Sequence, residues 1–116
     1  MALNANLKID QGATFEVTFN LKDDNDEALD LTGFTARSKI RKTFTAPTSI
    51  DFVATVNAIA GSVNLFLSAN TTAAIHAGQY VYDCELVNGN TVSRFVQGVI
   101  TISAEVTKND PWSYRI

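Results

Sequence analysis

The strict alternation of apolar and polar residues between Thr14 and Leu21 constrains the fold more than any other feature of the chain. This segment reads TFEVTFNL, and every second residue is phenylalanine, valine or leucine. Successive side chains of a β-strand point to opposite faces, so the segment has one apolar face and one polar face. It therefore predicts a half-buried β-strand.

The same two-residue period recurs along most of the chain. Gln11–Gly12 separates the first two predicted strands, and Asn88-Gly89 is the strongest hairpin signal in the sequence. Gly98 stands in the middle of the last predicted strand, where a glycine indicates a bulge that redirects the strand. Strands are predicted over about residues 3–9, 14–21, 36–41, 50–56, 63–67, 80–86 and 91–102.

One helical turn interrupts the strands. In SANTTAAIHAG, Ser68 or Asn70 can cap its start and Gly78 can end it in the left-handed conformation. The pattern predicts an all-β fold, an immunoglobulin-like β-sandwich of about seven antiparallel strands with this turn before strand F. Tyr80 is the candidate for the tyrosine that hydrogen-bonds back to the corner before strand F, and Gly33 permits the turn into the third strand.

The composition fits one globular domain without a disulfide. The chain has 116 residues, of which 46% are hydrophobic and 18% charged. A chain of this length buries roughly 65% of its unfolded surface. Cys84 is the only cysteine, so packing alone must hold the sandwich, and its place on an apolar face favours a structural thiol. We expect a domain over residues 1–108 and an extended tail over 109–116.

The charge pattern bears on possible partners. Nine basic and twelve acidic residues give a net charge of −3, which disfavours nucleic acid as a partner. Arg37, Lys39 and Arg41 form a basic stripe on the exposed face of one strand, and an acidic loop spans residues 23–30. The two regions are either solvated surface or complementary patches for head-to-tail docking of identical copies.

No leader or membrane segment is expected. The first ten residues lack both a positive start and an apolar run, which disfavours a secretory signal. No stretch approaches the roughly 20 apolar residues of a membrane span. We expect a soluble protein that is made in the cytoplasm and has no membrane partner.

The sequence contains no recognisable catalytic or metal-binding pattern. His76 is the only histidine and is expected at the surface or a helix end. The acidic loop fails the EF-hand spacing, because neither the required glycine nor the closing glutamate is present. Asp83 and Glu85 share one strand face, as two carboxylates of a glycosidase might, but nothing beside them indicates a sugar cleft. We expect a non-enzymatic protein without metal or cofactor.

The tail reads NDPWSYRI and is unusually aromatic for a chain terminus. In an extended segment Trp112, Tyr114 and Ile116 lie on one side, and large aromatic residues are frequent interface anchors. The tail is therefore predicted to fold back on its own sandwich or to lie on a neighbouring protein.

Four short motifs follow one another along the chain: Leu31-Thr32-Gly33, Ile40-Arg41, the segment GQYVYD and Val106-Thr107. With the strands around them, they resemble a class of small bacteriophage virion proteins, and in outline the N-terminal domain of lactococcal phage baseplate upper proteins. The similarity covers about residues 9–108. It implies a structural, non-catalytic role and therefore no active-site residues.

The resemblance implies a virion protein that acts in multiple copies with other phage structural proteins. Its expected place is the tail, baseplate or fibre region, or the head as a decoration protein. A carbohydrate-binding module for host-surface glycans is the alternative, with Phe66, Phe95, Trp112 and Tyr114 as candidate aromatic contacts. A bacterial adhesin repeat is a third possibility.

Overall fold

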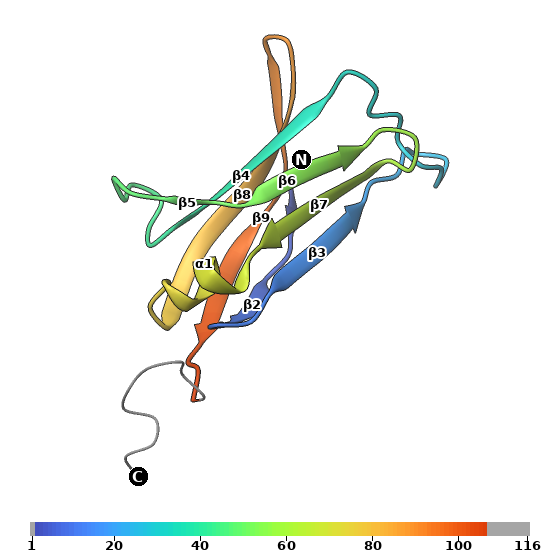
Figure 1. Cartoon of the computed structure of the whole chain (residues 1–116). Helices are drawn as coiled ribbons and strands as arrows, with labels where there is room; N and C mark the ends of the chain where they lie inside the picture. The colour runs from blue at the N-terminus through green and yellow to red at the C-terminus, as the bar shows by residue number, and fades with distance from the viewer. Residues whose placement is uncertain (1, 107–116) are drawn as a thin grey trace.

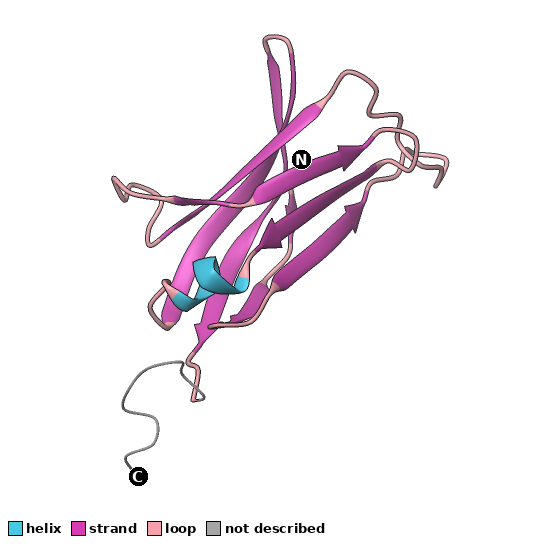
Figure 2. Cartoon of the chain, viewed as in Figure 1, coloured by secondary structure: helices cyan, strands magenta, loops and turns pink. Residues whose placement is uncertain are grey.

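The computed structural model describes residues 2–106, which form two β-sheets packed face to face with one short helix at one end (Figures 1 and 2). The predicted all-β sandwich is confirmed. The expected tail over residues 109–116 lies outside the described residues. Within residues 2–106, no helix is long and apolar enough to span a membrane.

The larger sheet has six strands in the order β1-β9-β8-β4-β5, with β2 also paired to β9. The smaller sheet has the order β3-β7-β6, and the helix α1 follows β7. The elements are β1 (Leu3–Asn4), β2 (Leu7–Asp10), β3 (Phe15–Asn20), β4 (Thr35–Arg41), β5 (Ile50–Asp51), β6 (Val53–Asn57), β7 (Ser62–Leu67), α1 (Ala69–Ala73), β8 (Gly78–Asn88) and β9 (Thr91–Ser103).

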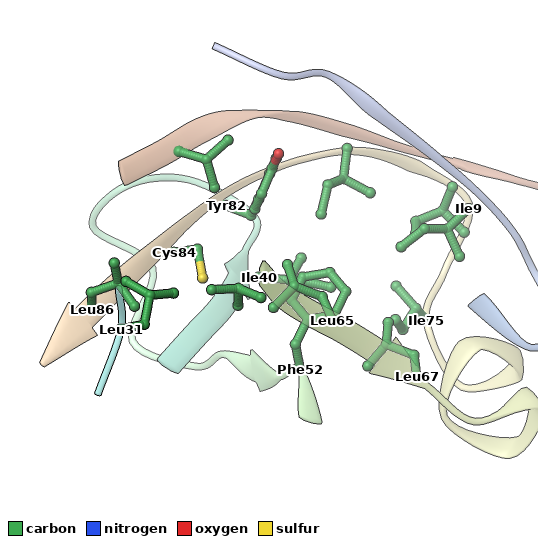
Figure 3. Packing of buried hydrophobic residues seen from close by; sticks show 14 residues of the cluster. Ile9, Leu31, Ile40, Phe52, Leu65, Leu67, Ile75, Tyr82, Cys84 and Leu86 are labelled. Atoms are coloured by element: carbon green, nitrogen blue, oxygen red, sulfur yellow. The ribbon is translucent and has the colours of Figure 1, made fainter. Parts of the chain in front are cut away.

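The core lies between the sheets and comes from the inward positions of the alternating strands. In β7 every second residue is buried, and in β8 the buried positions are Tyr82, Cys84 and Leu86. Figure 3 shows Tyr82 and Cys84 among the apolar side chains of both sheets. The two-residue period of the sequence therefore reports correctly which side chains face inward.

The predicted fourth strand is two strands that belong to different sheets. β5 pairs with β4 in the larger sheet, whereas β6 pairs with β7 in the smaller one. The chain changes sheets at Phe52, whose amide donates to the Ser38 carbonyl oxygen and whose buried ring packs near Phe15 and Tyr82. An uninterrupted apolar alternation gave no sign of this change.

The expectation of purely antiparallel pairing is wrong for the N-terminal strands. β1 and β2 both run parallel to β9, with Leu3 opposite Val96 and Leu7 opposite Ile100. Between β1 and β2 the backbone ladder is interrupted, and the Asn6 side-chain oxygen accepts the hydrogen bond of the Val99 amide instead (3.0 Å).

The predicted role of Gly98 as a bulge is also wrong. The irregularity between β8 and β9 lies between Cys84 and Glu85, three residues away along β9, where Phe95 is the extra residue. A Cβ at Gly98 would lie 2.2 Å from the carbonyl oxygen of Ala5. Gly98 therefore permits a close backbone approach, the other use of a glycine within a strand.

Tyr82 lies opposite Gly98 on β8. Because the backbone of Ala5 comes close to Gly98, the Tyr82 side chain can reach it across β9. The Tyr82 hydroxyl donates to the Ala5 carbonyl oxygen at 2.6 Å. Tyr82 is almost fully buried, and burial raises its pKa to about 12, so the hydroxyl remains a neutral donor. One side chain thus joins the centre of the larger sheet to the N-terminal strand.

The helix begins as predicted, but its end differs. Ser68 is the N-cap and accepts a hydrogen bond from the Thr71 amide. The helix ends at Ala73 with Ala74 as the C-cap, whereas Gly78 (φ 142°) is the first residue of β8, so Gly78 does not terminate the helix.

The helix is tied to the turn between β2 and β3. The Thr72 hydroxyl, which is fully buried, donates to Ala13 O and accepts from Gly12 N. The Gln11 side chain donates to Ile75 O and accepts from Glu105 N. These hydrogen bonds fix the end of the sandwich where β2, α1 and β9 meet.

Candidate functional site

The three basic residues of the predicted stripe lie on the outer face of the larger sheet. Along β4, Ser38 and Ile40 are buried, whereas Arg37 and Lys39 are exposed and Arg41 is half-buried. This arrangement follows from the alternation of the strand. The residue positions of the stripe are therefore as the sequence indicates.

The stripe is not a free basic surface, because carboxylates from neighbouring strands pair with two of its three residues, Arg37 and Lys39. Arg37 lies opposite Glu85 on β8 and pairs with it at 2.7 Å. Lys39 pairs with Asp51 on β5 at 2.6 Å. The two carboxylates of β8 are thus explained, since Glu85 binds Arg37 and Asp83 lies 3.3 Å from Arg94 of β9.

The acidic loop is likewise engaged within its own chain. The Asp23 carboxylate accepts hydrogen bonds from the amides of Asn25 and Glu27. The Asp30 carboxylate accepts from the hydroxyl and the amide of Thr32, and these bonds lower the pKa of Asp30. The two aspartates therefore shape the turns of the loop. Among the described residues, no group of histidine, cysteine or acidic side chains could hold a metal ion.

A hollow of about 350 Å³ lies over the paired charges on the outer face of the larger sheet. The connection between β4 and β5 forms part of its wall and carries Phe44, whose side chain is among the most exposed of the large apolar residues (82%). Arg41 holds this connection through a hydrogen bond from Nη1 to Ala46 O at 2.8 Å. The hollow is lined by Arg37, Lys39, Arg41, Phe44, Val81, Tyr82, Asp83, Glu85, Arg94 and Gln97.

The chemistry of the hollow is mixed. Four cationic and three anionic side chains lie in it or beside it, counting Asp51, and most are held in ion pairs. Its apolar part is Phe44 with Val81. The hollow thus combines charged groups of both signs with an apolar group.

The remaining sequence-predicted residues lie apart from this hollow. The Tyr80 hydroxyl donates to His76 O at 2.8 Å, in the connection that precedes β8. Lys42 Nζ lies 4.7 Å from the centre of the Tyr80 ring and donates to Gln79 O. Gly33 has a φ of 83° in the turn before β4, a conformation that favours glycine.

The candidate aromatic contacts do not form a platform in the described residues. Phe95 packs edge-on against Phe19 in the sandwich, with ring centres 6.2 Å apart. Phe66 is half-buried on the outer face of β7, in the other sheet. Trp112, Tyr114 and Ile116 lie outside the described residues. Phe44 was missed because it stands in a connection without periodicity, where sequence patterns carry little information.

Cys84 and His76 stay separate from any site. Cys84 is fully buried, and burial raises the pKa of its thiol to about 12. A neutral, inaccessible thiol is a packing group, as the sequence indicates. His76 is exposed after the helix, as expected.

Comparison with known proteins gives a likeness of fold. No protein-family model and no curated protein matches the chain. The N-terminal domain of phage TP901-1 ORF48 is similar with a TM-score of 0.54 and 11% identity, and the alignment covers 85% of each chain. InlP of Listeria monocytogenes aligns with a TM-score of 0.49 and 18% identity over 88% of this chain and 28% of that one. At such identities the first likeness shows that the β-sandwich is shared with a phage protein domain.

Proposed function

We propose that this protein is a non-enzymatic structural component of a phage virion, acting as an attachment or assembly module in multiple copies. The observation that carries the proposal is the similarity to the phage ORF48 domain, which extends over 85% of both chains. Because the alignment spans most of both chains, the likeness extends over most of the β-sandwich and is not limited to a few shared strands. We also propose that the sandwich is of the immunoglobulin-like type.

The outer face of the larger sheet supports a binding role with protein partners. Its charges are close to balanced and are paired within the chain, so little electrostatic attraction for a polyanion remains. The expected partners are other phage structural proteins and further copies of this chain. The tail, baseplate or fibre region is favoured over the head because of the resemblance described above.

The direct test is localisation. Antibodies against the recombinant chain should label particles produced from the genome that encodes it, at a repeated position seen by electron microscopy. Mass spectrometry of purified particles should detect the chain after high-salt washing. Absence of the chain from purified, infectious particles would overturn the proposal.

A second test addresses the tail. Deleting Pro111–Ile116 should leave thermal unfolding of the sandwich unchanged and abolish incorporation into particles, since Trp112 and Tyr114 are predicted anchors. If particles contain the truncated protein at the wild-type level, the tail is not the anchor and another surface attaches the protein.

The glycan-binding alternative is favoured by one observation. Phe44 is exposed beside guanidinium, carboxylate and amide groups of the hollow, the combination of an apolar face and orienting polar groups found in ligand sites. Host-surface glycans should then bind the wild-type chain and lose binding to Phe44→Ala. Phe66→Ala, on the opposite face, is the matched control.

A further inference from the structure

The open edge of the smaller sheet, along β6, lacks the features that normally prevent strands from pairing with other chains. An edge strand presents unpaired amide and carbonyl groups, and proteins protect it with charges, prolines, bulges, breaks or covering segments. The segment from Phe52 to Ala60 contains no charged residue, no proline and no glycine. Its exposed side chains include Val53 (60%) and Ile59 (92%).

The other edges of the sandwich carry such protection. β5 has only two residues, and its Asp51 is paired with Lys39. The N-terminal edge is interrupted after Asn4 and exposes the charged Lys8 and Asp10. β3 carries Glu16 on its exposed face.

Within the described residues, the backbone of Val53–Val56 makes hydrogen bonds only to β7. The two ends of the strand are fixed by other contacts, the Phe52 amide to Ser38 O and the Leu31 amide to Ala58 O. Between these contacts, the outer edge of the five-residue strand β6 is open to a partner strand. A partner longer than about five residues would meet the connection that contains Leu31.

We propose that β6 pairs antiparallel with β6 of a second copy of this chain, about a twofold axis through Thr55. The two three-stranded sheets then become one continuous sheet. On the outer face, the exposed Val53 lies opposite Asn57 of the second copy. On the inner face, Ala54 lies opposite Val56, so these two half-buried side chains become covered. A twofold interface brings the same patch of both copies together, and β6 meets this condition because like charges never face each other.

The charge distribution favours this interface over head-to-tail docking of the stripe on the acidic loop. Arg37 and Lys39 are already neutralised by Glu85 and Asp51, and Asp23 and Asp30 already serve their own turns. Breaking these contacts would offset what a new contact gains. β6 itself carries no charged side chain, so pairing along this edge removes no charge from water.

The proposal refines the multi-copy role above but can fail without it, because pairing is measured on the isolated full-length chain. Sedimentation across a concentration series should show a monomer–dimer equilibrium for the wild-type protein. Thr55→Lys and Thr55→Glu should each weaken dimerisation by about tenfold or more, because residue 55 faces itself across the axis. An equal mixture of the two variants should restore dimers.

Thr18→Lys is the matched control. Thr18 lies on the same outer face as Thr55, with Asn64 of β7 between them, so it introduces the same charge away from the β6 edge. It should dimerise like the wild type. Circular dichroism checks that each variant is folded.

A covalent test uses Thr55→Cys. Paired residues of antiparallel strands have Cα atoms about 4.5–5.5 Å apart, which a disulfide can bridge. Mild oxidation should give a cross-linked dimer for Thr55→Cys and none for Thr18→Cys, while the buried Cys84 stays unreactive. A wild-type protein that remains monomeric to about 1 mM, or unchanged dimerisation of Thr55→Lys, would overturn the proposal. Either result leaves the particle-labelling test intact.

Discussion

The two sheets of the sandwich end in opposite ways. In the larger sheet, the N-terminal strands β1 and β2 pair with the free edge of β9, and ion pairs lie on the outer face. The smaller sheet ends at β6, an uncharged strand with an unpaired edge. Of the two outer faces, that of the larger sheet therefore carries charged residues of both signs, whereas that of the smaller sheet carries only Glu16 within its described strands. The difference shows that the two sheets offer chemically different surfaces, one polar and largely paired within the chain, the other nearly uncharged with an open edge.

The largest expected effect, at alkaline pH, tests the packing of Tyr82 and Cys84 on the inner face of the larger sheet. Burial raises the pKa of both Cys84 and Tyr82 to about 12, from 9.0 and 10.0. Both groups are neutral when folded, so their contribution to the unfolding free energy is complete below pH 9 and is lost as pH rises from 9 to 12. The melting temperature should fall steeply over this range. Cys84→Ala should move the start of the fall upward, toward pH 10, and an unchanged profile would contradict the burial of this pair.

The next effect comes from Tyr82→Ala, which removes a buried ring and the hydrogen bond to Ala5. It should destabilise the domain by about 3–5 kcal/mol, as for other buried aromatic truncations. Tyr80→Phe, which removes only the bond to His76 O, should cost about 1 kcal/mol. Denaturant unfolding measures both values. The alanine variant of Tyr80 should lose less unfolding free energy than Tyr82→Ala. Equal losses for the two alanine variants would contradict a special role of Tyr82 in the core.

A smaller effect is expected from Gly98→Ala. The new Cβ would collide with Ala5 O, so the N-terminal strand must shift, at a cost of about 1–3 kcal/mol. Hydrogen exchange should increase at residues 3–10 before the rest of the domain. Gly89→Asn is the matched control, because Gly89 has a φ of 59°, which asparagine tolerates, and open space around it. Protection of residues 3–10 equal to wild type would mean that Gly98 does not seal this edge.

The smallest effect concerns the paired charges of the larger sheet. A double-mutant cycle of Arg37→Ala and Glu85→Ala should give a coupling of about 0–1 kcal/mol, because the Arg37 side chain is largely exposed. The coupling should decrease further with added salt. A coupling well above this range would show that the ion pairs hold the sheet together and do not merely neutralise its face.

Much of the fold follows from local patterns. The alternation in β3, the Ser68 cap and the hairpin after Asn88 are each set by neighbouring residues, and each is confirmed, with the turn itself at Gly89 and Asn90. The parallel N-terminal strands and the role of Gly98 depend on a contact between residues more than ninety positions apart. No periodicity in either segment records such a contact.

The candidate surface was predictable only in part. Alternation correctly placed Arg37, Lys39 and Arg41 on one outer face. The pairing of Arg37 and Lys39 with carboxylates depends on which strands lie beside β4, and a sequence pattern does not specify that order. For the same reason, the open edge at β6 is visible only once the sheet order is known.

The parallel pairing of β2 with β9 also has a mechanical consequence. If tension is applied near residue 3 and near residue 103, it pulls these neighbouring strands along their length in opposite directions. The hydrogen bonds of the parallel ladder then carry the load together and must break together, whereas a hairpin pulled at its open end is peeled one bond at a time. Force applied to residues 2 and 106 should therefore give higher rupture forces than force applied across the open end of the β8–β9 hairpin. A pull on the two ends of the domain is thus passed directly from the first strands to the last one, across the β1–β9 and β2–β9 ladders.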